Sequence, residues 1–360
     1  MHSQVVVVGG GPGGYAAAFL AADLGMEVAL VEADPRLGGT CLLRGCIPSK
    51  ALLHVAKILS EARDMEAWGV DFSAPKLNVE KMRARKDDVI GTLSKGLGEL
   101  AKRRKVKRIH ARGLFVDSNT LQLEGGDPET YESQRLTFDH CILATGSVPA
   151  MPKLFQIGSA RVMDSTGALA LEDIPKTLLV IGGGYIGLEM GTVYAELGSD
   201  VSVVEMTSGL LPGADRDLVK PLAKRLDGLF AEIRLDTKVV ALRDVGDHVE
   251  VDVESESGSE TLKYERVLVS IGRRPATSGI GLENTKVQVD GRGFVQIDDR
   301  QRTSDDAILA IGDAAGEPML VHKAAAEGKV AAEVLAGEPA AFDATASAAV
   351  RVQCMVMASS

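Results

Sequence analysis

Cys41 and Cys46 stand five residues apart in the segment GGTCLLRGCIPSK, residues 38–50, and form the most specific chemical signal in the chain. In a regular helix this spacing separates the Cα atoms by roughly 8.6 Å, too far for a disulfide, so a bridge needs the distorted turn that Gly45 permits. Pro48 suits the first turn of a following helix, which puts Cys46 at a helix N-terminus, where the dipole favours a thiolate. A zinc site needs about four ligands, and no second Cys/His cluster is near in sequence. Two unpaired buried thiols are the other alternative, but the pattern favours a redox-active dithiol.

The glycines are concentrated in two matching units. A short β-branched strand leads into GGGPGG, residues 9–14, then into an Ala-rich helical stretch and a second strand that ends at Glu32. Another apolar strand leads into GGGYIG, residues 182–187, and from there to Glu205. The separation from first glycine to acid is 23 residues in both units. Each unit is therefore predicted to be a β–α–β element with G-x-G-x-x-G at its first turn.

The glycine spacing has a physical reason in dinucleotide binding. The first glycine permits a tight turn, the second lets the backbone approach a pyrophosphate, and the third lets the helix pack close to the strand. The helix N-terminus then offers free N–H groups and a positive dipole end to the phosphates. These roles fall to Gly9, Gly11 and Gly14 in the first unit and to Gly182, Gly184 and Gly187 in the second. A structural turn is the alternative for one such motif, but two complete units predict two bound dinucleotides.

The acids at the ends of the two units indicate which dinucleotides bind. Glu32 and Glu205 stand where a carboxylate accepts hydrogen bonds from a ribose diol. A carboxylate at Glu205 also repels a 2′-phosphate, and an arginine would be expected for NADP. The second site is therefore predicted to bind NAD.

Composition limits the class of protein. The chain has 360 residues, 45% hydrophobic and 25% charged, which is typical of a soluble globular protein of two or three domains. The net charge of −10 argues against a general nucleic-acid or anionic-membrane surface. No apolar run reaches the roughly 18 residues of a spanning helix, and the N-terminus has no export signal. Four cysteines are too few for a disulfide scaffold, so we expect a cytoplasmic protein without a metal site.

Three further apolar strands stop at a glycine, in residues 141–146, 267–272 and 308–313. Small residues after a strand let a loop pass beneath a bound cofactor, although three unrelated strand ends are an alternative. Asp313 is a candidate for contact with a ribitol or ribose hydroxyl group. Helices are expected over 51–63 and 79–102.

Short strands are expected over 106–136, and alternating residues predict an antiparallel meander over 238–270. The predicted fold class is α/β, with two Rossmann-like domains that have parallel sheets and antiparallel β-meander additions.

With these motifs in place, the chain resembles the pyridine-nucleotide disulfide oxidoreductases, and within them the branch that oxidises dihydrolipoamide. The segments that carry the resemblance span about residues 4–343 and include GGTCLLRGCIPSK, SIGRRP and AIGDAAGEPMLVHKAAAEGKVAAEVLAG. The resemblance implies FAD in the first site and NAD in the second. It also implies that Cys46 is the thiol nearer the flavin, that Cys41 exchanges with the substrate, and that Lys50 lies at the flavin with Glu189 close to it.

The same resemblance implies two sets of cofactor-binding residues. For FAD they are Gly9, Gly11, Gly14, Glu32, Gly39, Thr40, Lys50, Gly113, Thr145, Gly146, Asp313, Met319 and Val321. For NAD they are Gly182, Gly184, Tyr185, Ile186, Gly187, Glu205, Val239, Gly272 and Arg273.

The expected domains are a discontinuous FAD-binding domain, residues 1–145 plus 275–340, and an inserted NAD-binding domain, residues 146–274. Members of the family continue through an interface domain that forms a homodimer and carries a His–Glu acid/base pair. Here residues 341–360 read as a truncated or divergent tail, and none of the six histidines has the context of that pair. We therefore expect the homodimer of the relatives to be lost.

Two classes of function are open. As an enzyme, the chain passes electrons from dihydrolipoamide, free or on the lipoyl domain of a 2-oxoacid dehydrogenase complex, through Cys41 and Cys46 and FAD to NAD+. As a remnant, it binds nucleotides without turning over lipoamide, or acts as a diaphorase. Mercuric and glutathione reductases share the C-x4-C pattern, but Glu205 argues against their NADPH preference.

Overall fold

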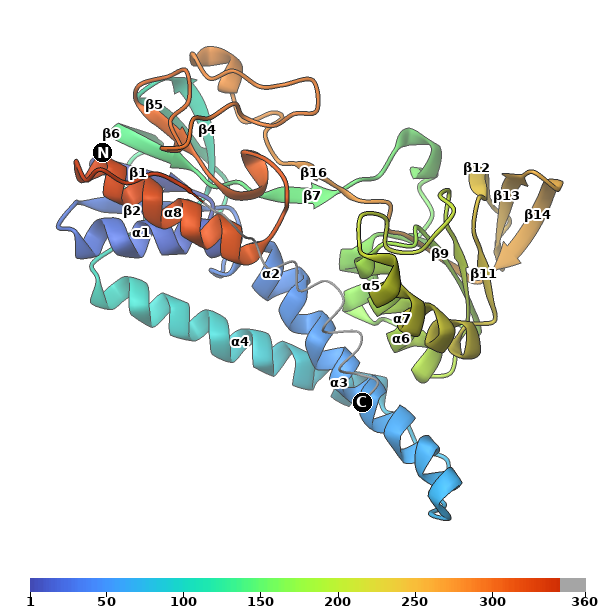
Figure 1. The fold of residues 1–360 in the computed structure, drawn as a ribbon. Coiled ribbons are helices and arrows are strands. Elements are labelled where there is room, and N and C mark those ends of the chain that lie inside the picture. The colour runs from blue at the N-terminus through green and yellow to red at the C-terminus, as the bar shows by residue number, and fades with distance from the viewer. Residues whose placement is uncertain (344–360) are drawn as a thin grey trace. The chain divides into compact units, whose positions relative to one another are not determined.

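The computed structural model describes residues 1–343, which divide into two compact units (Figure 1). Among the described residues, the first unit consists of Met1–Leu43, Ile90–Val148 and residues 274–343, and the second of Arg44–Val89 and Pro149–Arg273. The predicted tail beyond residue 343 lies outside the described residues.

A seven-stranded sheet forms the centre of the first unit. Its strands are β1 (His2–Val8), β2 (Val28–Glu32), β3 (Lys107–His110), β4 (Arg112–Asp117), β5 (Thr120–Glu124), β6 (Arg135–Leu143) and β17 (Ile308–Ala310). The order is β3-β2-β1-β6-β5-β4, and β17 adds to β6. All pairs among β1, β2, β3, β6 and β17 are parallel, whereas β4 and β5 extend the sheet in antiparallel fashion. The four valines of β1 at positions 5–8 are buried because both faces of a central parallel strand are covered.

Two helices made largely of small residues pack along each other in the first unit, α1 (Pro12–Asp23) and α8 (Val321–Leu335) (Figure 1). Ala17, Ala18 and Ala21 of α1 and Ala331 and Ala332 of α8 are buried, so the helix backbones approach closely. The long helix α4 (Val79–Arg103) begins in the stretch assigned to the second unit and ends in the first.

The second unit has a five-stranded, wholly parallel sheet. Its strands are β8 (Val162–Met163), β9 (Thr177–Ile181), β10 (Asp200–Val204), β11 (Glu232–Arg234) and β15 (Arg266–Val269), in the order β11-β10-β9-β15-β8. Its helices are α3 (Cys46–Asp64), α5 (Ser165–Ala170), α6 (Tyr185–Glu196) and α7 (Arg216–Leu229). The core between sheet and helices is aliphatic, with Leu178, Val180, Leu188 and Val201 fully buried.

An antiparallel meander follows in the second unit, as the alternating sequence predicts. It consists of β12 (Lys238–Asp244), β13 (Val249–Ser255) and β14 (Gly258–Tyr264). Val249, Val251 and Val253 point to one buried face. The final part of the predicted meander, β15, instead joins the parallel sheet beside β9, because its residues are buried on both faces.

The remaining elements are short. They are α2 (Gly39–Arg44), β7 (Ser147–Pro149), β16 (Arg273–Pro275) and the 3₁₀ turns η1 (Met65–Trp68), η2 (Pro128–Thr130), η3 (Lys153–Phe155), η4 (Leu282–Asn284) and η5 (Gly312–Ala314). Strands β7 and β16 pair with each other where the chain passes between the units.

The packing of residues 44–89 differs from the sequence-based boundaries, which placed them in the first domain. Helix α3 packs against α6, and Lys86 donates a hydrogen bond of 2.8 Å to the carbonyl oxygen of Leu169 at the end of α5. Arg63 also pairs with the buried Glu196. These contacts group 44–89 with the second unit, while the cofactor that each unit binds stays a prediction.

The fold class is confirmed, since parallel sheets covered by helices and antiparallel additions make up the described chain. Within residues 1–343, every helix is too short or too polar to cross a membrane.

Candidate functional site

The first glycine loop, between β1 and α1, has no room for side chains at its first and third positions. Gly9 has a φ of +108°, and a Cβ added there would lie 2.2 Å from the carbonyl oxygen of Ala144. A Cβ added at Gly14 would lie 1.8 Å from the carbonyl oxygen of Gly9. The protein itself therefore requires these two glycines, the first for the turn and the third for the approach of helix to strand.

Gly11 is different, because its own surroundings would accept a side chain. The nearest atom to an added Cβ is the Cα of Gly39, at 3.7 Å, which is an ordinary contact distance. A Cβ at Gly39, by contrast, would lie 2.5 Å from the Cα of Gly11. Gly11 is also the N-cap residue of α1, and no side chain caps this helix. The bare backbone at Gly11 and the uncapped N-terminus suit the close approach of a pyrophosphate.

Glu32 is tied to the same loop by its carboxylate. Oε2 accepts a hydrogen bond of 2.6 Å from the N–H of Gly10, and Oε1 accepts one of 2.8 Å from the N–H of Asp34. Each carboxylate oxygen can accept more than one hydrogen bond, so the group is oriented and keeps capacity for a ribose diol.

Two strand ends and the η5 turn bring polar groups together elsewhere in the first unit. Ser147 donates from Oγ to Oδ2 of Asp313 at 2.5 Å, and Thr40 donates from Oγ1 to the carbonyl oxygen of Ser147 at 3.5 Å. Thr145 Oγ1 is buried and has no hydrogen-bond partner among residues 1–343. A buried hydroxyl of this kind normally has a partner, so its position next to the glycine loop fits a bound polar ligand. Sequence reasoning missed Ser147, whose only signal is its position after the Thr145-Gly146 strand end.

The second glycine loop, between β9 and α6, repeats this arrangement. Gly182 has a φ of +107°, and an added Cβ would lie 2.6 Å from the carbonyl oxygen of Ser270. An added Cβ at Gly187 would lie 2.4 Å from Oγ of Ser270 and 2.5 Å from the carbonyl oxygen of Gly182. At Gly184, no atom of residues 1–343, apart from its two chain neighbours, lies within 4 Å of an added Cβ. The second position is again the one that only a ligand would require to be glycine.

Glu205 is held more tightly than Glu32. Oε2 accepts a hydrogen bond of 2.6 Å from the N–H of Gly183, while Oε1 accepts bonds of 2.7 and 2.8 Å from the N–H and Oγ1 of Thr207. Glu205 is 8% exposed. The hydroxyl of Thr207 is a positioning group that the sequence did not reveal, because nothing in the G-x-G-x-x-G pattern specifies it.

The cysteine segment breaks where Gly45 was expected to distort the chain. Helix α2 ends at Arg44 and α3 begins at Cys46, with Gly45 between them at φ −149° and ψ −117°. The carbonyl oxygen of Cys46 accepts a hydrogen bond from Oγ of Ser49, and the Cys46 side chain is at the surface. The boundary between the two units falls between Leu43 and Arg44, so the predicted bridge from Cys41 to Cys46 stays a prediction.

Tyr15 lies near Cys41 in the first unit, a proximity that the sequence did not indicate. Burial raises the pKa of the Tyr15 phenol, and the charge of the nearby Cys41 raises that pKa further. Cys141 in β6 is fully buried, and burial raises the pKa of its thiol. A thiol held neutral in this way is a poor nucleophile. Cys46 is exposed and Cys41 partly exposed, so these two stay the candidates for thiol chemistry among the described cysteines.

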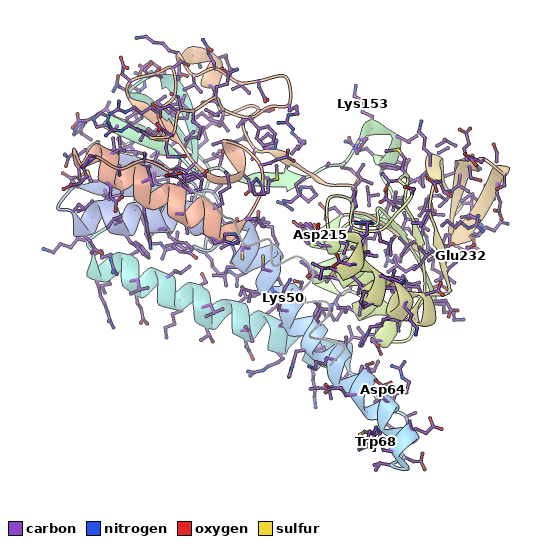
Figure 2. All side chains as sticks on the ribbon, viewed as in Figure 1. Lys50, Asp64, Trp68, Lys153, Asp215 and Glu232 are labelled. Carbon is purple, nitrogen blue, oxygen red and sulfur yellow. The ribbon has the colours of Figure 1, made fainter. Side chains whose placement is uncertain are left out.

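Lys50 and Glu189 form an ion pair within the second unit. Lys50 projects from α3 (Figure 2), and its Nζ lies 2.7 Å from Oε1 of Glu189 in α6. Glu189 is 5% exposed, whereas the Lys50 side chain is 41% exposed. The structure thus brings together two of the four residues predicted to be catalytic.

The other predicted cofactor residues lie at scattered positions. In β4, a Cβ on Gly113 would lie 3.3 Å from Leu121, so packing alone explains this glycine. Val239 is buried in β12, and Val321 opens α8 and is exposed. Met319 lies in the turn before α8. The others are Gly146 after β6, Tyr185 and Ile186 at the start of α6, and Gly272 and Arg273 at the start of β16. Their contacts with a cofactor stay predictions.

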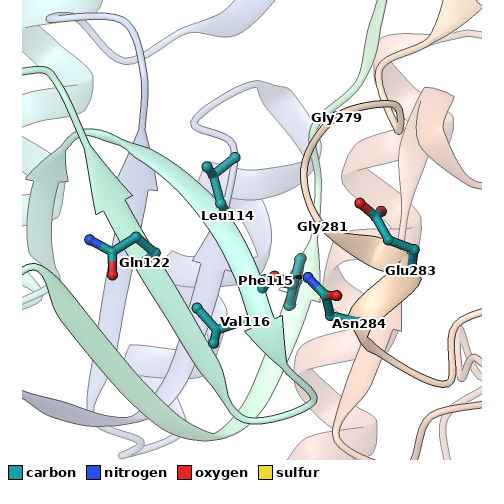
Figure 3. Close-up of a pocket in the computed structure, with 8 residues that line it drawn as sticks. All are labelled: Leu114, Phe115, Val116, Gln122, Gly279, Gly281, Glu283 and Asn284. Carbon is teal, nitrogen blue, oxygen red and sulfur yellow. Dashed lines mark hydrogen bonds between the residues drawn. The ribbon is translucent and has the colours of Figure 1, made fainter.

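An open hollow of about 560 Å³ lies between the β4–β5 hairpin and the chain around η4 (Figure 3). Asn284 donates from Nδ2 to the carbonyl oxygen of Phe115 at 2.9 Å, and a Cβ at Gly281 would lie 2.2 Å from that oxygen. None of its lining residues is among the predicted site residues. The hollow follows from how the hairpin packs, and we assign it no ligand.

The chain is similar to a protein family, to relatives in sequence and to a solved structure, and all of these concern disulfide or dihydrolipoyl oxidoreductases. Residues 3–328 match the family described as pyridine nucleotide-disulphide oxidoreductase. The chain is 46% identical to dihydrolipoyl dehydrogenase of Haemophilus influenzae over 345 residues and 45% identical to that of Vibrio cholerae over 344. Each alignment covers 95% of this chain and 71% of the relative. Among solved structures, the Cu(II) complex of the HOCl-induced flavoprotein disulfide reductase RclA from Escherichia coli is similar, with a TM-score of 0.80 and 28% identity over 94% of this chain and 73% of that one.

Proposed function

Because the chain belongs to the pyridine nucleotide-disulphide oxidoreductase family, we propose that it oxidises a dithiol of the dihydrolipoyl type and reduces NAD+. It is an FAD-dependent disulfide oxidoreductase of the dihydrolipoyl dehydrogenase type, and its cofactors are FAD and NAD. The proposal adds the substrate, the residue roles and the assignment of each cofactor to one unit. The observation that carries it is the C-x4-C pair, broken at Gly45 so that Cys46 starts α3.

We assign FAD to the first unit, where the residues fit it. Gly11 leaves bare backbone for the pyrophosphate, Glu32 is oriented for a ribose, and Asp313 and Thr145 offer further polar groups. When bound, FAD accepts an electron pair from the protein dithiol and passes it to NAD+ as hydride. NAD is assigned to the second unit, at Gly184 and Glu205, since the buried carboxylate disfavours a 2′-phosphate.

The protein's own sulfur atoms carry the thiol step. A thiolate of the substrate dithiol attacks Cys41 of an oxidised Cys41–Cys46 pair, breaks the S–S bond and forms a mixed disulfide. The second substrate thiol, after losing its proton, displaces Cys41 and closes the substrate disulfide, which leaves Cys41 and Cys46 reduced. The sum is dithiol plus NAD+ giving disulfide, NADH and one proton. Cys46 lies at the N-terminus of the 19-residue helix α3, which favours its thiolate form.

Lys50 has an electrostatic role in this proposal. It lies one turn after Cys46 on α3, and the buried Glu189 holds its ammonium group by the 2.7 Å ion pair. A fixed positive charge stabilises negative charge that develops nearby during electron transfer. The donor in the cell is proposed to be dihydrolipoamide or the lipoyl domain of a 2-oxoacid dehydrogenase complex, in the cytoplasm, where cysteines outside catalysis stay reduced.

The test compares two activities of one preparation of the 360-residue chain loaded with FAD. Dihydrolipoamide-dependent NAD+ reduction reports the thiol route, and NADH oxidation by a dye reports the route that bypasses the cysteines. We expect Cys41→Ser and Cys46→Ser to abolish the first activity and to spare the second. Dye activity without any lipoamide turnover in the unaltered chain would favour the diaphorase, and light scattering on the same sample gives the oligomeric state.

The two thiols are also distinguished by their spectra. On two-electron reduction, a long-wavelength charge-transfer band from thiolate to flavin is expected in the unaltered chain. Cys46→Ser should abolish this band, whereas Cys41→Ser should retain a thiolate near the flavin. Identical behaviour of the two variants contradicts the assigned roles.

A further inference from the structure

A buried ion pair on α8 lies beneath the turn that carries Asp313. Lys323 Nζ and Glu327 Oε1 are 2.8 Å apart, with side chains 9% and 3% exposed. Sequence reasoning did not single out either residue as functional, because an i,i+4 Lys–Glu pair is typical of an exposed helix face. Here the pair is taken out of water, which is costly for two charges unless further hydrogen bonds compensate.

Those further hydrogen bonds all go to the backbone of η5 and the residues just after it. Glu327 Oε2 accepts a hydrogen bond of 2.7 Å from the N–H of Gly312. Lys323 Nζ donates to the carbonyl oxygens of Gly312 and Gly316 at 3.4 and 3.3 Å. The two charged groups therefore hold both the N–H and the carbonyl oxygen of the residue immediately before Asp313.

The same turns of α8 also touch the glycine loop at the start of α1. A Cβ at Gly13 would lie 3.0 Å from the carbonyl oxygen of Ala324, and a Cβ at Gly328 would lie 2.5 Å from the carbonyl oxygen of Gly13. A Cβ at Gly312 would lie 3.1 Å from Cβ of Ala324. One segment of α8 thus contacts both the glycine loop and the Asp313 turn.

We infer that the Lys323–Glu327 pair is a positioning device for Asp313, and that it sets the affinity of the first unit for FAD. With the Gly312 peptide held at both ends, the Asp313 carboxylate is directed to the hydroxyl of Ser147 and keeps lone pairs for a hydroxyl of the ligand. The pair acts through Asp313 and does not itself contact the nucleotide. This inference rests on the proposed assignment of FAD to the first unit.

The main test replaces both charges together, in Lys323→Met with Glu327→Leu. Replacing a buried ion pair by apolar residues of similar size is often neutral for stability, so a pair that only fills the core should leave FAD binding unchanged. We expect instead that the FAD dissociation constant rises roughly 10- to 100-fold, as for the loss of a hydrogen bond to a charged group. The measurement is flavin fluorescence on serial dilution of the FAD-loaded chain.

Three comparisons separate positioning from general damage. ADP, measured as a competitor of FAD, spans only the Glu32 half of the site, so its inhibition constant should change less than about threefold. The loss of FAD affinity in the Lys323/Glu327 double variant should not add to the loss in Asp313→Ala, because both changes remove the same contact. The partly exposed i,i+4 pair Lys57–Glu61, changed in the same way to Met and Leu, should leave FAD binding unaltered.

A milder variant covers the case in which the double variant fails to fold. Glu327→Gln keeps an oxygen for the Gly312 N–H and removes only the charge, so a smaller rise of the FAD dissociation constant is expected with ADP again unaffected. Equal weakening of FAD and ADP, unchanged FAD binding, or full additivity with Asp313→Ala would overturn the inference. FAD binding that survives Gly11→Val would refute the assignment of FAD to this unit, a failure distinct from the others.

Discussion

The two glycine loops of this chain share their backbone design and differ in what supports it. In both, the first and third glycines are required by the protein, the second is not, and a glutamate accepts the N–H of the residue after the first glycine. The first loop is packed against α8, which also carries the buried Lys323–Glu327 pair. At the second loop, the Ser270 hydroxyl lies against Gly187 and donates to the carbonyl oxygen of Ile181.

Under the proposed assignment of FAD to the first unit and NAD to the second, this difference suits two kinds of ligand. A cofactor that remains bound through turnover benefits from a turn held rigidly by buried charges, because less ordering is needed when it binds. A substrate that must leave after every cycle needs an oriented carboxylate and little more. Glu205, with three hydrogen bonds from Gly183 and Thr207, is such a group.

The largest expected effect comes from the third glycine of each loop. Gly14→Ala places a Cβ 1.8 Å from a backbone oxygen, and the loop must shift to accommodate it. We expect the free energy of unfolding to fall by about 3 kcal/mol. Gly187→Ala meets a serine hydroxyl that can rotate away, as well as the backbone oxygen of Gly182, so a smaller loss is expected. Urea denaturation of both variants gives the comparison, and equal losses would show that the two loops are equally rigid.

The second glycine of each loop should separate binding from stability. Gly11→Val and Gly184→Val add a side chain where the protein leaves room for a first carbon atom, so the urea midpoint should hardly change. Binding should weaken roughly a hundredfold, the equivalent of about 2.7 kcal/mol of steric conflict. FAD retention is the readout for Gly11→Val, and the KM for NADH in the dye assay is the readout for Gly184→Val. If each variant affects the other cofactor, the cofactor assignment is reversed.

The acid of the second unit should control the choice between NADH and NADPH. Glu205→Ala removes both the diol contact and the repulsion of a 2′-phosphate, so kcat/KM for NADH should fall about tenfold. Glu205→Arg should bring kcat/KM for NADPH still closer to that for NADH, because a guanidinium binds phosphate. Glu32→Ala serves as the matched control. It should weaken FAD binding and leave the ratio of kcat/KM for NADH to that for NADPH unaltered. If Glu205→Ala leaves the ratio of kcat/KM for NADH to that for NADPH unchanged, Glu205 does not select between the two cofactors.

The smallest expected effect tests the hydrogen bond that only the second loop has. Thr207→Val removes the hydroxyl that donates to Oε1 of Glu205 at 2.8 Å and keeps the backbone N–H donor. The KM for NADH should rise about threefold, as for one neutral hydrogen bond, and kcat should stay the same. Thr207→Ser retains the hydroxyl and should restore the KM. A KM that serine does not restore would mean that Thr207 acts by packing.

Much of the site could be predicted from the sequence, because it depends on backbone conformations that neighbouring residues set. Gly14 and Gly187 lie against the carbonyl oxygens of Gly9 and Gly182, five residues earlier, and Gly9 and Gly182 have the positive φ that the turn needs. A distorted turn was expected at Gly45, and the chain breaks there between α2 and α3. The α/β class and the family were also predictable, because strand, loop, helix and acid recur at set distances along the chain. The sheets of the structure and the family match confirm both predictions.

Some contacts of the site join residues that are far apart in the sequence, and one of them involves Ser147, which the sequence did not reveal. Ser147 meets Asp313 across 166 positions, and Lys50 meets Glu189 across 139, although the resemblance anticipated the second pair. Residues 44–89 were placed with the first domain because they follow it in sequence, but the packing of α3 against α6 groups them with the second unit.

By itself, the sequence determined where the two glycine loops and the cysteine segment lie, because glycine, proline and acid placement act through local backbone geometry. Only the tertiary structure decided what holds those loops in place. An i,i+4 Lys–Glu pair has the same local pattern at 57–61 and at 323–327. The first pair remains partly exposed to water, whereas the second is buried against the backbone of Gly312. Burial depends on which distant segments pack above a helix, and no local spacing specifies that.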